Sequence, residues 1–350
     1  MANDSPPRRP VIDCHSDVMI EVLRRRRSGE RAVLTRVHLP AFTEGGVVAT
    51  VCTVGGDIDM LCPLGLERPY ESTLAVLEEL RADVAESEGK FEIAGSAADV
   101  EACIARGAFA IIPAIEGALP FEGKLPLIED LYERGLRIVG LTWNSRNELA
   151  VGLNSGEGGL TPFGERAVAL MNDLGMLIDS AHATPATFWD VARVSRAPLY
   201  NSHSNARAVW DHERNLDDAQ LEAIRSSGGA VGLNFCPSFI AAYPVTLDEV
   251  VVQLDALLRR TGDDSVVIGA DFAEYFIEEM RAEIDKHPNL YDLEGLQYPQ
   301  GVETVRSMQN LIRAMTEHGL SETAIENVAG RTFLRVFEQT QALATTPAAP

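Results

Sequence analysis

Apolar residues along the chain gather in short runs that alternate with stretches of helical periodicity. Eight apolar, β-branched runs can be distinguished, and several of them are apolar at nearly every position, as in parallel strands buried on both faces. They lie near residues 11–16, 47–54, 109–115, 137–143, 176–181, 198–202, 230–236 and 265–271. Between most of them, apolar residues recur at helical spacing, over 74–84, 125–135, 163–174, 185–194, 217–225 and 247–260. This alternation predicts an α/β fold, a (β/α)8 TIM barrel.

Helix boundary signals agree with this division. Glycines stand where predicted helices should end, at 135, 175, 228, 262 and 319. Thr184-Pro185 and Asp217-Asp218 are typical of helix N-termini, where a short polar side chain can accept a backbone N–H. The helical periods are therefore expected to begin and end close to these residues.

Two stretches exceed the connections of a minimal barrel. Residues 55–73 follow the second strand, and residues 273–300, with Tyr275, Tyr291 and Tyr298, follow the eighth. Loops after barrel strands lie at the carboxyl face, where active sites of this fold are built. Both stretches are therefore expected to shape a pocket.

The length and apolar content suit one large domain. The 350 residues are 46% hydrophobic, and α/β barrels commonly reach this size as one unit. We expect a barrel domain over 11–340, a flexible N-terminus over 1–10 and a flexible tail over 341–350. The basic run Arg24–Arg27 is interpreted as the solvated face of a helix.

Charge and cysteine content limit the partners. The formal charge is −22, which opposes binding to nucleic acid and to anionic membranes. No apolar run is long enough to span a bilayer, and the N-terminus lacks the apolar core of a secretory signal. The five scattered cysteines without a CxxC pattern indicate thiols in a cytoplasmic protein.

Ligand-type side chains stand at the ends of five predicted strands. The carboxyl ends of barrel strands ring one mouth, so these residues are expected to converge. They are His15 and Asp17, Glu116, His182, His203 and Asp271. In an extended strand, His15 and Asp17 point to the same side and Cys14 to the other. His38, His212, His287 and His318 lie away from strand ends and are interpreted as surface or structural residues.

Imidazole and carboxylate ligands without thiolate favour zinc, with manganese or cobalt as alternatives. Two ions roughly 3.5–4 Å apart can share one carboxylate, a role that suits Glu116. Asp271 can then act as the base that moves protons. Each residue also has an ordinary alternative: His182 could be a core histidine, His203 part of a polar loop, Glu116 a turn residue and Asp271 a helix cap. Their joint position at five strand ends favours the metal site.

At this point the sequence resembles the renal (membrane) dipeptidase family of zinc metallopeptidases, within the amidohydrolase-like barrels. The resemblance extends from about Pro10 to Glu338. It rests on segments that occur in this order: Ile12–Asp17, Gly45–Val47, Ile115–Gly117, Leu141–Asn144, Gly159–Gly164, Leu177–His182, Ser195–Pro198, Ser202–Ser204, Arg214–Asp218 and Gly269–Phe272.

The resemblance implies a binuclear zinc dipeptidase that acts through metal-bound hydroxide and tolerates a D-residue on the C-terminal side. The family's metal ligands fall on His15, Asp17, Glu116, His182 and His203. Its acid/base aspartate falls on Asp271, and the arginine that grips the substrate carboxylate falls on Arg214. It also suggests a homodimer. A bidentate arginine–carboxylate clamp is the physical reason for such an arginine.

One position departs from the better-known members. They carry a histidine after Leu-Thr in the fourth-strand motif, where it is thought to hold the scissile carbonyl oxygen; this chain has Trp143. The single indole N–H of Trp143, or Asn144 beside it, is a candidate for that contact. Trp143 could instead only pack the mouth. Alternative functions are therefore hydrolysis of another small amide or lactam, a lyase or isomerase with one metal, and a non-catalytic binding barrel.

Overall fold

The eight predicted strands close into one parallel barrel in the computed structural model, which describes residues 8–277 and 297–345. The sheet order is β2-β1-β9-β8-β7-β6-β5-β4, and β2 pairs with β4 to close the ring, from Ala49↔Ala110 to Gly56↔Glu116. The barrel strands are β1 Val11–Ser16, β2 Val47–Gly56, β4 Phe109–Glu116, β5 Ile138–Gly140, β6 Leu177–Asp179, β7 Tyr200–Asn201, β8 Ala230–Leu233 and β9 Val266–Ile268. The predicted fold class is confirmed.

A ninth strand was not predicted. β3 (Phe91–Ile93) pairs with the first half of β4, whereas β5 pairs with its second half, starting at Ala114↔Ile138. Both strands therefore share one edge of β4. Three residues are too short to produce a recognisable β pattern, which explains why the sequence did not reveal β3.

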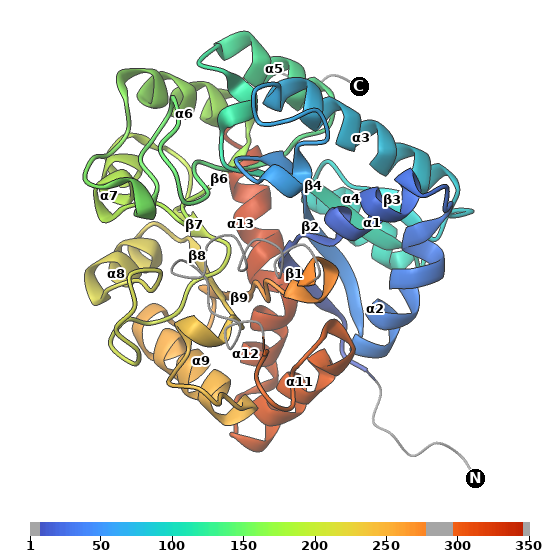
Figure 1. Ribbon diagram of the computed structural model, residues 1–350. Coiled ribbons are helices and arrows are strands. Elements are labelled where there is room, and N and C mark those ends of the chain that lie inside the picture. The colour runs from blue at the N-terminus through green and yellow to red at the C-terminus, as the bar shows by residue number, and fades with distance from the viewer. Residues whose placement is uncertain (1–7, 278–296, 346–350) are drawn as a thin grey trace.

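Helices surround the strands (Figure 1). They are α1 Val18–Arg27, α2 Leu39–Gly45, α3 Pro69–Ala85, α4 Ala97–Ala105, α5 Leu125–Glu133, α6 Pro162–Leu174, α7 Pro185–Val194, α8 Asp218–Ser226, α9 Leu247–Thr261, α11 Met308–Glu317, α12 Glu322–Glu326 and α13 Thr332–Gln341. All six predicted helical stretches are present. The expected loop over 55–73 is shorter than predicted, because β2 reaches Gly56 and α3 begins at Pro69.

The predicted helix ends are formed by the expected residues. Thr184 accepts the backbone N–H of Thr187 at the start of α7, and Asp217 forms a capping box with Gln220 at the start of α8. Gly175 ends α6 in a left-handed conformation, with φ 71°. These caps satisfy backbone groups that a helix end leaves without a partner.

The end of the barrel opposite the ligands is filled by apolar side chains. Ile12, Ala49 and Ala110, near the starts of their strands, share one buried cluster with Phe333 and Phe337 of α13. In Figure 1, α13 runs across the barrel. The last helix therefore closes this end, so any opening for a small molecule is at the carboxyl ends of the strands.

The arginine run in α1 is only partly solvated, which corrects the interpretation of Arg24–Arg27 as an exposed face. Arg26 is 8% exposed and donates to Asp83 and Glu86, both at 2.7 Å. Asp83 also accepts the backbone N–H of Leu34 at 2.8 Å. The buried guanidinium of Arg26 fixes α1 against α3 through these carboxylates. The position of Arg26 in its helix could not reveal these partners.

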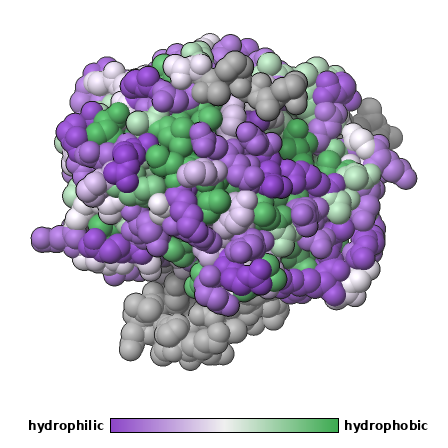
Figure 2. All heavy atoms as spheres, turned by 90° about the horizontal axis from the view of Figure 1, so that it is seen from above, coloured by the Kyte–Doolittle hydropathy of each residue, from purple (hydrophilic) through white to green (hydrophobic). Residues whose placement is uncertain are grey.

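Figure 2 shows hydrophilic residues spread over the face it presents, with smaller apolar areas between them, as suits the formal charge of −22. In the part of the chain that the structure describes, no helix combines the length and the apolar character needed to cross a bilayer. Of the expected thiols, Cys14, Cys52, Cys62 and Cys103 are buried.

Candidate metal centre

The six residues predicted for metal binding and proton transfer all lie at carboxyl ends of barrel strands. His15 and Glu116 stand within the last two residues of β1 and β4, and Asp17 directly follows β1. His182, His203 and Asp271 come two or three residues after β6, β7 and β9. Two overlapping groups of ligand atoms, each within 4.8 Å of one another, comprise His15, Glu116 and His203, and His15, Asp17 and Asp271.

Glu116 occupies the middle of this arrangement. Its Oε1 atom lies 2.9 Å from Nε2 of His182, 3.5 Å from Nε2 of His203 and 3.8 Å from Nε2 of His15. Nε2 of His15 is in turn 3.7 Å from Oδ1 of Asp271 and 3.9 Å from Oδ2 of Asp17. One carboxylate thus faces two sets of ligands, which is the position that a bridging ligand requires.

Unpartnered buried atoms indicate that these residues fit a cation. Nε2 of His15 and Oδ1 of Asp17 are buried and have no hydrogen-bond partner among the described residues. Buried polar atoms are nearly always satisfied, so each such atom requires an explanation. A divalent cation held by imidazole nitrogens and carboxylate oxygens would satisfy both, and this donor set suits zinc or manganese.

The pKa values of the ligands respond mainly to burial. Burial raises the pKa of Glu116 well above its usual range and lowers the pKa of His182 and His203 well below theirs. Burial also acts to lower the pKa of His15, but the carboxylates of Glu116, Asp17 and Asp271 together raise it. Three carboxyl groups therefore surround His15, and a bound cation would favour their charged forms.

Backbone irregularities present these side chains to the mouth. β1 carries one extra residue relative to β2 between Asp13 and Ser16, a bulge of the kind that redirects side chains. His182 and Asp271 adopt left-handed conformations, with φ of 60° and 55°. Non-glycine residues rarely do so, and such strain gathers at functional sites.

Three further buried carboxylates hold the ligand-bearing segments in place. Asp13 accepts the backbone N–H of Ala270 at 3.0 Å and thereby ties β1 to the segment of Asp271. Oδ1 of Asp57 accepts the backbone N–H of Leu119 at 2.9 Å and so holds the segment that follows Glu116. Gly117 follows with φ 97°, and a Cβ there would lie 2.1 Å from the Asp57 carboxyl carbon. The turn after Glu116 therefore requires glycine.

The third carboxylate, Asp179, supports His203. The Ser202 hydroxyl donates to Oδ2 of Asp179, and Oγ of Ser202 lies 2.6 Å from Nδ1 of His203. On the neighbouring histidine, Nδ1 of His182 lies 2.9 Å from Oδ1 of Asn144. The Nε2 atoms of the two histidines lie 3.0 Å apart and face Glu116.

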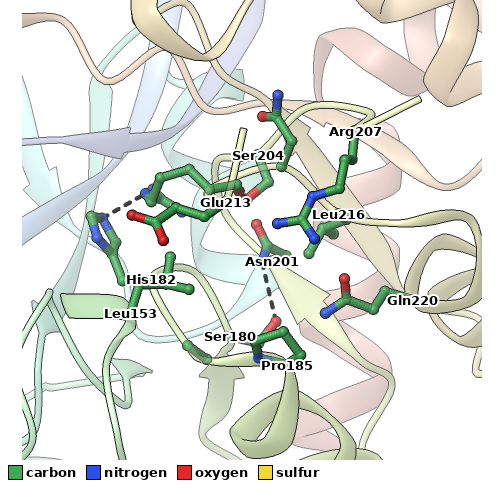
Figure 3. Close-up of a pocket in the computed structure, with 13 residues that line it drawn as sticks. Leu153, Ser180, His182, Pro185, Asn201, Ser204, Arg207, Glu213, Leu216 and Gln220 are labelled. Carbon is green, nitrogen blue, oxygen red and sulfur yellow. Dashed lines mark hydrogen bonds between the residues drawn. The ribbon is translucent and has the colours of Figure 1, made fainter. Parts of the chain in front are cut away.

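Arg214 lies beside the candidate ligands. It is 7% exposed, and its Nη2 atom lies 3.1 Å from Nε2 of His182. Its backbone N–H donates to Nδ1 of His212 at 3.1 Å, so this histidine supports the Arg214 loop. Figure 3 shows an adjoining pocket with His182 on one side and Arg207 and Gln220 on the other.

Trp143 and Asn144 follow β5 at the same mouth. The Trp143 ring is half-buried, 6.5 Å from the His182 ring between centroids. Asn144 is engaged with His182 through Oδ1. The predicted substrate contacts of both residues stay predictions. Of the tyrosines in the predicted loop 273–300, Tyr275 is buried and the Tyr298 hydroxyl donates to the Asp271 carbonyl. Tyr291 and His287 lie outside the described residues.

With this geometry established, the sequence can be placed among known proteins. Residues 5–350 match the membrane dipeptidase family, peptidase family M19. The chain belongs to this family. It is therefore a dipeptidase of the M19 metallopeptidases, a hydrolase of peptide bonds, as the strand-end motifs predicted.

Related proteins cover nearly the whole chain. An uncharacterized dipeptidase of Schizosaccharomyces pombe is 29% identical over 95% of this chain and 81% of its own length. The crystal structure of dipeptidase AC, an M19 metallopeptidase, matches with a TM-score of 0.81 and 29% identity, over 95% of this chain and 99% of its own. A metallopeptidase from Rhodobacter sphaeroides, crystallised with a phosphinate mimic of the dipeptide L-Ala-D-Ala, matches with a TM-score of 0.81 and 28% identity, over 95% of this chain and 100% of its own.

Sequence reasoning missed the supporting residues of this dipeptidase. Asp13, Asp57, Asp179 and Ser202 were not assigned a role, although three of them stand inside the quoted motifs. The available signal was an acidic residue within, or directly after, an otherwise apolar strand. Such a carboxylate is buried and must be stabilised by donors, which marks it as part of a hydrogen-bond network.

Proposed function

We propose that this M19 dipeptidase carries two zinc ions and hydrolyses dipeptides, including those with a D-residue on the C-terminal side. The observation that carries the proposal is Glu116, whose carboxylate faces three imidazole nitrogens at 2.9–3.8 Å. His15 and Asp17 would hold one ion, His182 and His203 the other, and Glu116 both. Bound there, the ions would polarise the scissile carbonyl and lower the pKa of water.

Asp271 is proposed as the acid/base residue. Its Oδ2 accepts from Nδ2 of Asn234 at 3.3 Å, and Oδ1 lies 3.7 Å from Nε2 of His15. Burial raises its pKa above that of an ordinary aspartate. A carboxyl with a raised pKa can take the proton of the attacking water and pass it to the leaving amine.

Arg214 is proposed to bind the C-terminal carboxylate of the dipeptide. Its guanidinium is buried, and its Nε atom has no hydrogen-bond partner among the described residues. A carboxylate ligand would satisfy this atom with a charge-assisted bond. Binding would also fix the short substrate at a set distance from Glu116, since a dipeptide has its carboxylate next to the scissile bond.

The proposal that a D-residue is accepted is supported by the solved relative from Rhodobacter sphaeroides, whose bound phosphinate mimics L-Ala-D-Ala. The side chain of the C-terminal residue is proposed to enter the pocket beside Arg214, where Leu153, Pro185 and Leu216 form apolar walls beside polar groups. The second candidate function, hydrolysis of another small amide or lactam on the same metal pair, is favoured only by Trp143.

Trp143 is proposed to donate its indole N–H to the scissile carbonyl oxygen. Trp143→Phe keeps the ring and removes the donor, so kcat for dipeptides should fall about 10-fold, as expected for one hydrogen bond of roughly 1.4 kcal/mol. A fall in substrate affinity alone, with kcat unchanged, would show that the ring only packs the mouth.

The central test is metal analysis of the purified chain together with a dipeptide panel of L,L and L,D pairs. The expected result is two zinc ions per chain and turnover of both classes. One ion per chain would overturn the proposed metal pair, and strong turnover of a non-peptide amide without dipeptide cleavage would favour the second candidate. Binding of no metal would overturn the proposed metal site. A homodimer and a cytoplasmic location stay predictions.

A further inference from the structure

His182 and His203 point their Nε2 atoms at the same place but are supported differently from behind. Nδ1 of His182 faces the amide oxygen of Asn144, a neutral group, at 2.9 Å. Nδ1 of His203 faces the Ser202 hydroxyl at 2.6 Å, and that hydroxyl also reaches the carboxylate of Asp179. Ser202 and His203 are 1% and 0% exposed, so water does not compete for these bonds.

The Ser202 hydroxyl can have only one orientation in this chain of bonds. It carries one hydrogen, and the carboxylate of Asp179 has none to offer. The hydrogen therefore lies between Oγ and Oδ2 of Asp179. Oγ must then accept from Nδ1 of His203, which carries the proton of the neutral imidazole and leaves the lone pair on Nε2.

We infer that Ser202 and Asp179 form a relay that fixes His203 in the tautomer able to bind metal through Nε2. The two residues are positioning residues, because neither lies among the atoms facing the candidate ions. The inference rests on the proposed metal site. Residues that hydrogen-bond to a metal ligand from behind typically contribute about 10–100-fold to metal affinity.

The surroundings of Asp179 make one substitution especially informative. Its other oxygen, Oδ1, accepts two backbone N–H groups, from Ala181 at 3.0 Å and from Ser202 at 2.8 Å. In Asp179→Asn, these two donors would hold the amide oxygen, so the amide NH2 would face Oγ of Ser202. The hydroxyl hydrogen would then turn to Nδ1 of His203 and place the imidazole proton on Nε2.

The relay therefore predicts an unusual order of metal affinities, measured by chelator competition on the full-length zinc-loaded chain. Ser202→Ala should weaken binding about 10–100-fold, since the tautomer is no longer imposed. Asp179→Asn should weaken it more, because the wrong tautomer is imposed. The double variant should bind zinc better than Asp179→Asn alone, because the misdirected hydroxyl is gone.

Ser180→Ala is the matched control. Its hydroxyl is buried at the same end of the barrel and donates to the Tyr200 carbonyl oxygen at 2.9 Å, not to a histidine. Its zinc affinity should stay within about threefold of the parent chain. Thermal unfolding of each variant shows whether the fold is intact, and excess zinc should restore activity in Ser202→Ala.

Each result decides between the relay and the metal site itself. A parent chain that binds no zinc would overturn the proposed function. A parent chain that binds zinc, with Ser202→Ala and Ser180→Ala alike, would overturn the relay only. A double variant weaker than Asp179→Asn would also overturn it, because additive losses indicate ordinary structural damage.

Discussion

The two ends of the barrel are built from the same strands but from opposite kinds of side chain. At the start of β1, Ile12 packs in an apolar cluster with Phe333 and Phe337 of α13. At its end, His15 and Asp17, three and five residues after Ile12, leave buried polar atoms without partners among the described residues. One end of each strand therefore contributes mainly to stability and the other to chemistry.

At the mouth, the backbone also departs from regular strand geometry. The pairing of β2 with β4 is regular from Ala49 to Thr53 and shifts before Gly56, next to Glu116. His182 and Asp271, at the mouth, occupy left-handed conformations. The well-packed apolar end can stabilise strain at the mouth. Substitutions at the two ends should thus separate loss of function from loss of stability.

Glu116→Gln should have the largest effect, because it removes the charge that faces three imidazoles. Zinc affinity should fall at least about 100-fold, since even outer partners contribute 10–100-fold. Activity should fall about 10⁴-fold or more, because in the proposed mechanism both carbonyl polarisation and water activation would depend on bound metal. Chelator competition and dipeptide hydrolysis measure the two losses. Glu122→Gln, whose carboxylate pairs with Lys124 at 2.7 Å, is the control and should be nearly silent.

Asp271→Asn should separate proton transfer from metal binding at the same mouth. Loss of a general acid/base typically lowers the rate about 10²–10⁴-fold. Zinc content should stay at the parent level, because His15, Asp17 and Glu116 remain. Metal analysis and kcat measured on one preparation provide the comparison. If Asp271→Asn lost zinc while Glu116→Gln kept it, the two roles would have to be exchanged.

Phe337→Ala tests the closed end. The side chain is fully buried and its ring is 5.6 Å from that of Phe333. Deleting it should lower the free energy of unfolding by about 3–5 kcal/mol, through lost burial and the cavity left behind. Denaturant unfolding measures this, and kcat of the folded variant at 25 °C should change less than twofold. A large fall in kcat with intact folding would show that the two ends are coupled.

The barrel, and the position of the candidate ligands at the ends of its strands, could be predicted from the sequence because both depend on local pattern. Strands buried on both faces read as apolar runs, and the position of His15 or Glu116 at the end of such a run is visible directly. The hydrogen bonds that hold the candidate ligands in place could not be predicted from the sequence. The partnership of Ser202 with Asp179 depends on two neighbouring strands, and the left-handed backbone of Asp271 leaves no residue signature. Arg26 was wrongly predicted to be solvated, because its position in the helix does not show that Asp83 and Glu86 lie beside it.

The smallest effect expected is a pH dependence that arises outside both ends, at His38. Its ring is 3% exposed and packs 5.6 Å from the Tyr275 ring, and burial lowers its pKa to about 3. Below the ordinary histidine pKa of roughly 6.5, the unfolded chain binds a proton that the folded chain does not bind until about pH 3, so acid favours unfolding. Between pH 7 and pH 5 this difference should remove about 2 kcal/mol of stability.

His38→Phe keeps an aromatic ring beside Tyr275 and removes the titrating group. The free energy of unfolding that the variant loses between pH 7 and pH 5, measured by denaturant unfolding, should therefore be about 2 kcal/mol smaller than the loss in the parent chain. Because acid weakens metal binding equally in both chains, the difference between them isolates His38, and equal losses would show that this histidine does not contribute.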